Sequence, residues 1–487
     1  MKLRIDSGSL HLLELAARMP FRYGIATLTR APHAFLSLRL LVDGRPWRGV
    51  SADLLPPRWF TKDPRQSLRE EIAAMARVIE AALEHARGLE GGSPFEIWEE
   101  LHARQGRWGK EARLPPLLVN FGSSLVERAL LEAFARSQGE PFWKLLHEDR
   151  LGIRLDRLHE ELAGLHPSQL LPPRPLPRIT ARHTVGLSDP IFDEDIPAAE
   201  RLSDGLPQSL EASIRAYGLR HFKVKVSGDI ERDFERLGRI GDALRSTAVE
   251  EPAYSLDGNE SFRSLEEFRQ WWEDIELLLI NKELAHFPAR LLFVEQPLHR
   301  DAALEPGLER ELAAWAGRPP LIIDESDAEL ESLPRALALG YAGTSHKNCK
   351  GVLKGIAHAC LLERRRRREP GRSFILSGED LANVGPVALL QDCAVAAALG
   401  VESVERNGHH YFAGLSAFPS AVQERVLEAH PDLYRRTPAG WPALKIEGGT
   451  LDLGSVHRAP LGVGFEIDLE PYLPLSRWKE SLKEDSD

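Results

Sequence analysis

The sequence predicts a parallel (β/α) barrel of the TIM type, preceded by an α+β domain. Between Arg182 and Arg406, eight short apolar runs alternate with helical stretches, as strands and helices do in such a barrel. The residues before them instead combine strand-like runs with long helical segments. An open doubly wound sheet is the alternative, but the Gly-rich phosphate turn that usually follows its first strand is not visible here.

The eight predicted strands are short. In chain order they read RHTVGL, HFKVKV, YSLDGN, LLFVEQP, LIIDES, GTSHKNC, SFILSGE and VESVER.

The N-terminal part is β-rich at first and then helical. Residues 34–42, AFLSLRLLV, are strand-like, and the turn signal Asp43-Gly44 follows them. Residues 65–88 predict an amphipathic helix that ends at a glycine. Residues 124–146 predict a helix, a Gly turn and a shorter helix.

A proline-rich stretch separates the two parts. Residues 165–180, LHPSQLLPPRPLPRIT, contain five prolines, which resist both helix and sheet. This stretch is a linker or, alternatively, a stiff surface loop inside one domain. We place the first domain at residues 1–170, the barrel at residues 175–440 and a C-terminal segment at residues 441–487. In the C-terminal segment, ALKIEGGTLDLGS predicts a strand, a turn and a strand.

Composition and charge exclude several classes of protein. Hydrophobic residues make up 43% and charged residues 28% of the 487 residues, which is ordinary for a globular protein. A formal net charge of −11 argues against general nucleic-acid binding. The three cysteines form no CxxC pair, which argues against a zinc cluster and indicates a reducing compartment. Because neither a signal peptide nor a membrane span is visible, we expect a cytoplasmic protein that does not bind membranes.

Three successive predicted strands end in an acidic residue, namely Asp257, Glu295 and Asp324. Parallel barrels collect functional groups at the carboxyl ends of their strands, so these carboxylates are expected at one rim. They would repel one another without a cation between them, and oxygen ligands in this number suit Mg²⁺. The alternative is that each acid caps the helix that follows it. Three consecutive strands ending in this way favour the metal site.

Lysines flank these acids in the sequence. Lys223 and Lys225, in HFKVKV, are two residues apart, so both side chains lie on the same face of the strand. Lys347 follows the sixth strand, in TSHKNCKG. Buried lysines are costly without acidic partners, so the pattern predicts ammonium groups on two sides of the metal.

Together these residues resemble the enolase superfamily, and specifically its branch of muconate-lactonizing enzymes and dipeptide epimerases (the mandelate racemase/muconate lactonizing enzyme family). The resemblance covers most of the chain. FRYG at residues 21–24 and the helical segment 124–146 resemble parts of this family's N-terminal capping domain. The resemblance implies that residues 1–170 cap the barrel, that the C-terminal tail returns to the cap, and that the protein forms a homo-oligomer.

The resemblance also implies a role for each candidate residue. The metal ligands map onto Asp257, Glu295 and Asp324, and the metal is Mg²⁺, with Mn²⁺ as an alternative. Lys225 and Lys347 are the implied bases on opposite faces of the substrate carbon. Residues that accompany these groups in the family are Asn259, Gln296, Pro297 and Glu325. Lys223 either lowers the pKa of Lys225 or contacts the substrate carboxylate.

The implied reaction removes the proton beside a carboxylate of a small-molecule substrate and gives an enediolate. The enolase superfamily is itself the standard example of this pattern, with a Lys or His base and Mg²⁺. Two active lysines imply racemisation or epimerisation, whereas one implies cycloisomerisation or β-elimination. The alternatives are a dehydratase of sugar acids and a non-catalytic homologue that binds a metal or a small acid.

The sequence departs from the family pattern after the sixth strand. The branch often has two glycines shortly after the lysine, but only Gly351 is present here. A shift in register would make Lys350 the inward residue in place of Lys347. We prefer Lys347 because it closes the apolar-to-polar transition sooner.

The last two strands depart from other branches of the family. The seventh strand, FILSGED, offers Glu379 and Asp380 but no histidine, which argues against the His–Asp dyad of mandelate racemase-like members. The region after the eighth strand carries His409 and His410, in NGHHYF. These histidines either contact the substrate or form a hydrogen-bonded loop.

Overall fold

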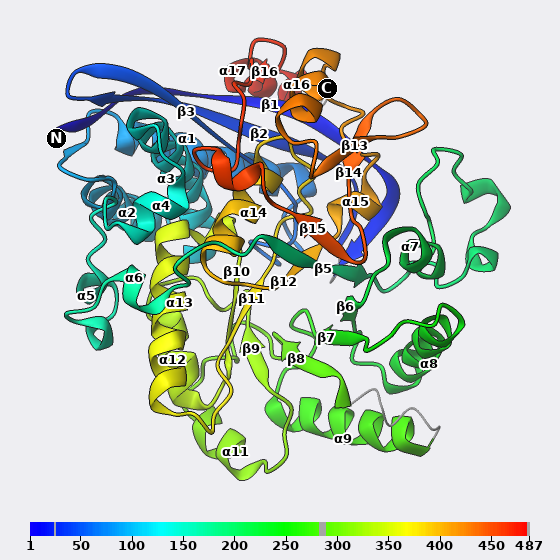
Figure 1. Ribbon diagram of the computed structural model, residues 1–487. Helices are drawn as coiled ribbons and strands as arrows, with labels where there is room; N and C mark the ends of the chain where they lie inside the picture. Colours follow the sequence, from blue (N-terminus) through cyan, green and yellow to red (C-terminus); the bar gives the residue numbers. More distant parts are fainter. Residues whose placement is uncertain (24–25, 282–288, 485–487) are drawn as a thin grey trace.

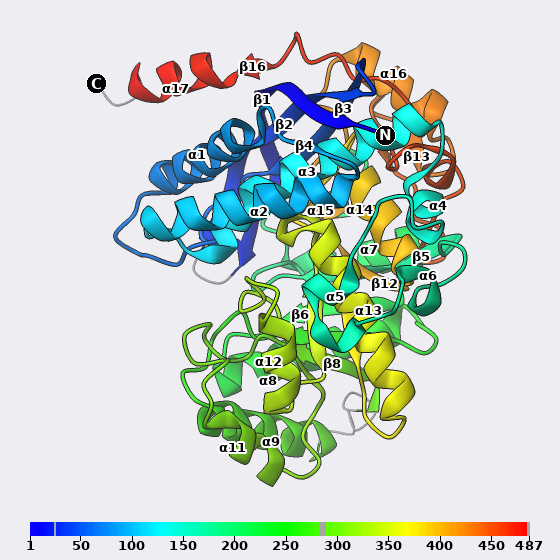
Figure 2. The same cartoon turned by 90° about the vertical axis from the view of Figure 1, so that its left-hand side faces the viewer.

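The computed structural model describes residues 1–23, 26–281 and 289–484. Figure 1 shows an antiparallel sheet with helices beside it at the top and a parallel barrel surrounded by helices below. Figure 2 shows the same two layers after a quarter turn. The predicted fold class, a parallel barrel with an N-terminal α+β cap, is confirmed.

The cap is built on a long antiparallel sheet. Its main strands are β1 (Leu3–Tyr23), β2 (Ala26–Val42) and β3 (Arg45–Leu54), with β4 (Glu90–Gly91) and β16 (Leu473–Pro474) paired to β1. Its helices are α1 (Leu68–Ala86), α2 (Pro94–Glu111), α3 (Pro116–Gln138) and α4 (Phe142–His147). Helix α3 packs against β3 and α1 and is buried on all sides from Leu117 to Ala135.

Local sequence signals explain the ends of the cap helices. Helix α1 lies within the predicted range 65–88, and Ser67 with Glu70 forms a capping box at its start. Helix α3 begins earlier than predicted, because Pro116 occupies a first-turn position that needs no N–H donor. It ends where Gly139 adopts a left-handed conformation with φ 63°.

Eight parallel strands form the barrel, one overlapping each predicted run. They are β5 (Arg178–Val185), β6 (His221–Lys225), β7 (Ala253–Asp257), β8 (Leu291–Glu295), β9 (Leu321–Ile323), β10 (Gly343–His346), β11 (Ile375–Gly378) and β12 (Ser403–Arg406). Strand β12 pairs with β5 in parallel, which closes the barrel. Closure places the carboxyl ends of all eight strands around one mouth.

Helices connect successive barrel strands. They are α7 (Leu210–Tyr217), α8 (Ile230–Ser246), α9 (Leu265–Asn281), α11 (Leu308–Ala314), α12 (Ser332–Leu339), α13 (Val352–Arg368) and α14 (Ala388–Ala398).

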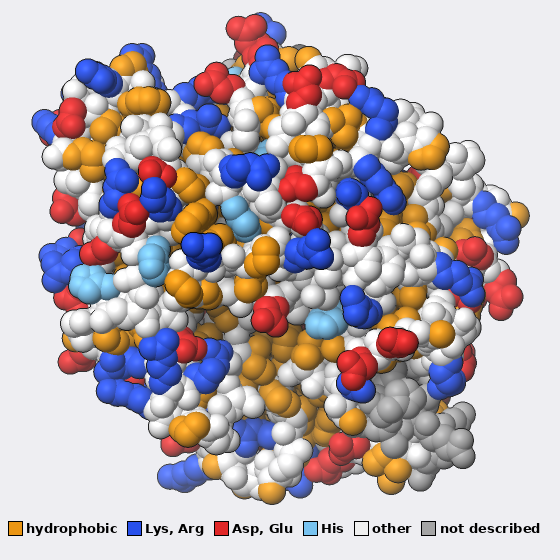
Figure 3. All heavy atoms as spheres, viewed as in Figure 1, with side chains coloured by type: hydrophobic (Ala, Val, Ile, Leu, Met, Phe, Trp, Pro, Cys, Tyr) orange, Lys and Arg blue, Asp and Glu red, His pale blue; other side chains and the backbone are white. Residues whose placement is uncertain are grey.

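Figure 3 shows acidic and basic side chains interspersed over one face of the molecule. Within the part of the chain that the structure describes, no helix combines the length and the apolar character needed to cross a bilayer.

The segment between the cap and the barrel and the C-terminal segment contain short elements. Between α4 and β5 lie α5 (Leu155–Leu158) and α6 (Pro167–Leu170). The C-terminal part contains α15 (Gly408–Tyr411), α16 (Ser420–Ala429), β13 (Tyr434–Arg436), β14 (Pro442–Leu444), β15 (Thr450–Asp452) and α17 (Leu475–Glu484). Strand β15 pairs with β5 of the barrel, whereas β16 returns to β1 of the cap. The C-terminal segment therefore contacts both parts, and the domain boundaries themselves stay predictions.

Candidate active site

The predicted acids lie at the mouth of the barrel. Asp257 ends β7, Glu295 ends β8, and Asp324 directly follows β9. All three side chains are buried, with relative exposures of 1% or less. The parallel register aligns Asp257 with Glu295 on neighbouring strands, so their carboxylates meet at the same level of the barrel.

Lys223 lies at the centre of these acids. Its Nζ is 3.0 Å from Asp257 Oδ2 and 2.8 Å from Glu295 Oε2. It is also 2.7 Å from Glu379 Oε2 and 3.0 Å from Glu405 Oε2. Burial opposes the charge on Lys223, but the four carboxylates outweigh burial and raise its pKa well above the ordinary value. Lys223 is therefore a fixed cation shared by four strands.

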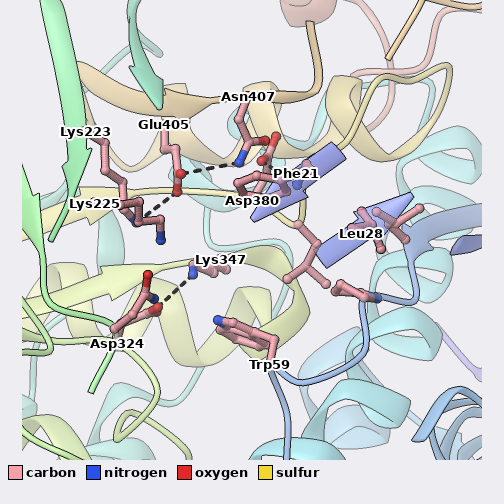
Figure 4. A pocket seen from close by; sticks show the side chains of 15 residues that line it. Phe21, Leu28, Trp59, Lys223, Lys225, Asp324, Lys347, Asp380, Glu405 and Asn407 are labelled. Carbon is pink, nitrogen blue, oxygen red and sulfur yellow. Dashed lines mark hydrogen bonds and ion pairs between the residues drawn. The ribbon is translucent and has the colours of Figure 1, made fainter. Parts of the chain in front are cut away.

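Lys225 and Lys347 reach the mouth from different strands. Lys225 Nζ donates a hydrogen bond of 2.5 Å to Asp257 Oδ2. Lys347 Nζ donates one of 2.8 Å to Asp324 Oδ2 and lies 3.3 Å from Glu379 Oε2. Figure 4 shows both ammonium groups at the same cavity, Lys225 beside Lys223 and Lys347 beside Asp324.

Lys350 has a different environment from Lys347. Its Nζ donates to the carbonyl oxygens of Asp324 and Ser345, at 2.8 and 3.0 Å, and to Ser345 Oγ at 2.9 Å. It also pairs with Asp324 Oδ1 at 2.8 Å. Lys347 lines the cavity, whereas Lys350 is not among the lining residues. Lys350 thus supports Asp324 from the barrel wall.

The spacing of the acids allows a metal ion. Glu295, Asp324 and Glu379 each offer a carboxylate oxygen within 4.8 Å of the others. Asp257, the third ligand predicted from the sequence, does not belong to this group. Its Oδ2 contacts Lys223 and Lys225. Glu379 directly follows β11, as the predicted ligands end or directly follow their strands. This position after a strand could have identified Glu379 as a candidate ligand from the sequence, but the predicted ligands did not include it.

The donor set fits a divalent cation. Glu295 Oε2 and Glu325 Oε2 are buried and have no hydrogen-bond partner, although Glu295 Oε2 does lie near the Lys223 ammonium. Burial and the neighbouring acids raise the pKa of Glu295 well above its ordinary value. Burial and Asp324 raise that of Glu325 to about 7. Carboxylates destabilised in this way gain from an added positive charge.

A cavity lies above these groups. The lining residues from the barrel are Lys223, Lys225, Asn259, Asp324, Lys347, Asp380, Leu381, Ala382, Glu405 and Asn407, and those from the cap are Phe21, Leu28, Leu54, Pro56 and Trp59. Trp59 places its ring 4.5 Å from Lys347 Nζ. The cap thus supplies most of the apolar wall, with Leu381 and Ala382 added from the barrel. The sequence did not reveal this contribution beyond the FRYG segment, whose Gly24 lies outside the described residues.

Asn259 and Gln296, two of the residues predicted to accompany the metal ligands, form hydrogen bonds with the acidic residues. Asn259 lines the cavity, and its N–H donates to Asp257 Oδ1 at 2.8 Å. Gln296 Oε1 accepts the N–H of Asp324 at 2.8 Å. Gln296 Nε2 donates to Ser326 Oγ, also at 2.8 Å. Gln296 therefore fixes the turn that presents Asp324.

The two histidines lie apart from the cavity. His409 Nε2 is 3.1 Å from His183 Nδ1, and His410 Nε2 is 3.8 Å from Asp189 Oδ2. Neither histidine lines the cavity. Burial lowers the pKa of both side chains well below the ordinary value. The contact of His409 with His183 agrees with the alternative of a hydrogen-bonded loop, whereas His410 Nδ1 is buried without a hydrogen-bond partner.

Fold and site together define a capped parallel barrel with carboxylates and lysines at its mouth. No protein-family model and no curated protein matches the sequence. Solved structures match over nearly the whole chain. A mandelate racemase/muconate lactonizing protein from Herpetosiphon aurantiacus has 18% identity and a TM-score of 0.58, covering 96% of this chain and 99% of its own.

Two further matching structures are those of a racemase and an epimerase. The N-succinyl Arg/Lys racemase from Bacillus cereus has 15% identity and a TM-score of 0.59, covering 96% of this chain and 98% of its own. The dipeptide epimerase from Enterococcus faecalis has 15% identity and a TM-score of 0.55, covering 95% of this chain and 100% of its own. The chain is similar to these proteins in fold, which confirms the predicted resemblance to the enolase superfamily at that level.

Proposed function

We propose that the chain is a Mg²⁺-dependent enzyme that removes the proton beside the carboxylate of a small-molecule substrate. The enediolate that results is protonated again, which gives racemisation or epimerisation. One observation carries this proposal: Lys225 and Lys347, from β6 and from the end of β10, both line the cavity into which Asp324 projects. Two proton carriers at one cavity are what proton transfer on both faces of a carbon requires.

The chain's own acids would hold the metal. Glu295 and Asp324 would bind Mg²⁺ together with Glu379 or Asp257, and the ion would supply positive charge at the substrate carboxylate. Lys223 would keep these acids close together, because it contacts all but Asp324 of the four. Lys350 would hold the backbone and side chain of Asp324 in place.

Charge balance supports a substrate that becomes more negative during the reaction. Five buried carboxylates at the mouth face five buried or nearly buried cations. The acids are Asp257, Glu295, Asp324, Glu379 and Glu405, and the cations are Arg182, Lys223, Lys225, Lys347 and Lys350. A divalent ion would add positive charge to this site, where an enediolate develops negative charge.

Cycloisomerisation or a dehydratase reaction are second candidates that need only one proton carrier. The seventh-strand position holds Glu379, which is paired with Lys223 and Arg182. A glutamate thus stands where a histidine would be needed as the base for sugar-acid dehydration. For this reason we favour the reaction with two lysines.

Exchange of the substrate proton tests the proposal. The protein is incubated with Mg²⁺ in D₂O and a panel of N-acyl amino acids, dipeptides and aldonic acids, and loss of the α-proton is followed by NMR. Lys225→Ala and Lys347→Ala should each abolish exchange on one face, whereas Lys354→Ala, which removes a lysine paired with Asp327, should retain both. Exchange on both faces in both site variants would refute the assignment, and loss of water would indicate a dehydratase.

A further inference from the structure

We infer that the non-reacting part of the substrate is an uncharged, apolar group that is held between Phe21 and Trp59. This inference rests on the proposed function and names the substrate class of the same cavity.

The apolar residues gather at one side of the cavity. Phe21 and Leu28 are paired across β1 and β2, so their side chains lie next to each other on one face of the sheet. Figure 4 shows Phe21, Leu28 and Trp59 on the side away from Lys223 and Lys225. A substrate whose carboxylate meets the lysines therefore directs its other end toward an apolar wall.

The charged lining groups are engaged in ion pairs with other groups of the barrel. Lys223, Lys225 and Lys347 each contact a carboxylate. Asp380 is paired with Arg406, a contact made within the barrel. Among the described lining residues, neither an arginine nor a histidine is available to a second anion of the substrate.

The lining offers the substrate body few polar partners. Asn407 Nδ2 donates to Glu405 Oε1 at 3.4 Å, while Asn407 Oδ1 is buried without a hydrogen-bond partner. Asn259 and Asn407 are the uncharged polar side chains among the described lining residues, and the acceptor of Asn407 suits one N–H group beside an apolar side chain.

The wall is held in place by contacts outside the cavity. Arg300 donates to the carbonyl oxygens of Trp59 and Phe60, each at 3.0 Å, and pairs with Glu260 at 2.7 Å. Glu260 also pairs with Lys62, at 2.5 Å. The segment that carries Trp59 is thereby tied to the loop after β7. A wall that is already ordered costs little to organise when the substrate binds.

The other aromatic wall is fixed in a similar way. The ring of Phe21 stacks on Tyr411, with ring centroids 4.0 Å apart. The hydroxyl of Tyr411 donates to Asp189 Oδ2 at 2.5 Å. Both walls therefore resist the rearrangement that a polar substrate body would require.

Matched acids test this inference. N-acetyl-leucine, N-acetyl-asparagine and N-acetyl-aspartate have side chains of nearly the same shape and differ in polarity. The acids 4-methylpentanoate, succinamate and succinate form a second set, whose members also have nearly the same shape and differ in polarity. Dissociation constants are measured by calorimetry with the full chain and Mg²⁺, and α-proton exchange is followed in D₂O for the N-acetyl series.

The apolar acid of each set should bind about tenfold to a hundredfold more tightly than the amide, and the second carboxylate should weaken binding further. Equal or tighter binding of the amides or diacids would overturn the inference, and so would failure of both apolar acids to bind. If the apolar acids bind most tightly but no acid exchanges its α-proton, the substrate class stands and the proposed reaction is refuted.

A pair of variants at Leu28 adds a test within the protein. Leu28→Met keeps an apolar side chain, whereas Leu28→Gln has a similar length and adds an amide. We expect the methionine variant to keep the preference for N-acetyl-leucine over N-acetyl-asparagine and the glutamine variant to reduce it about tenfold. An unchanged preference in a folded Leu28→Gln protein would contradict the role of this wall.

Discussion

Replacing Lys223 by methionine should destabilise the metal-free protein and increase its response to Mg²⁺. The ammonium group of Lys223 lies within 3.0 Å of oxygens from Asp257, Glu295, Glu379 and Glu405. The variant leaves these buried carboxylates without their shared cation. A divalent ion at Glu295 would restore the missing positive charge.

The size of the effect follows from the burial of the group. Removing one partner of a buried ion pair costs about 3–5 kcal/mol. An unfolding entropy of about 2.1 cal/mol/K per residue over 487 residues amounts to about 1 kcal/mol/K. The Tm of the metal-free variant should therefore fall by about 3–5 °C. The increase in Tm on adding Mg²⁺ should exceed that of the unchanged protein by a similar amount.

Thermal unfolding by circular dichroism, with EDTA or with saturating Mg²⁺, measures both effects. Lys354→Met is the matched control, because Lys354 is a buried lysine that pairs with Asp327 at 3.0 Å and with none of the proposed ligands. The control should lose Tm but gain no extra response to Mg²⁺. If Lys223→Met responds to Mg²⁺ no more strongly than the unchanged protein, the shared-cation reasoning is wrong.

Three further changes have defined outcomes. Burial raises the pKa of Glu127 to about 7 in the folded protein, above the unfolded value of 4.5, so stability is lost as the pH rises between these two values. Urea unfolding at several pH values measures this loss. Compared with Glu127→Gln, the unfolding free energy of the unchanged protein should fall by roughly 3 kcal/mol over that range. Arg300→Met removes hydrogen bonds to the segment at Trp59, so cleavage between residues 57 and 66 in limited proteolysis should become about tenfold faster. Lys350→Met removes the support of Asp324, so Mg²⁺ affinity measured by calorimetry should fall about tenfold.

The barrel could be predicted because its strands are local signals. Most are short runs rich in apolar residues, and this pattern can be recognised without any knowledge of the partner strands. Asp257, Glu295 and Asp324 were found in the same way, because the end of a strand fixes a position at the barrel mouth. Which acid oxygens meet is a separate question, since it depends on side-chain directions across the barrel.

The cap's contribution to the cavity could not be predicted from local patterns. Trp59 and Leu54 reach the cavity through the packing of one domain on the other, and no periodicity in the chain encodes that contact. The same limit explains His409 and His410. Their place after a strand left open whether they contact the substrate or form a hydrogen-bonded loop. The chain turns into α15 and buries both beside His183.

A titration with Mn²⁺, followed by electron paramagnetic resonance, tests the central claim most directly. The claim is that Glu295 and Asp324 hold one divalent ion at the barrel mouth. We predict one bound Mn²⁺ per chain, with affinity reduced at least about a hundredfold in Glu295→Gln and Asp324→Asn. Comparing Asp257→Asn with Glu379→Gln then identifies the third ligand. Binding of Mn²⁺ by Glu295→Gln and Asp324→Asn with unchanged affinity would contradict the account.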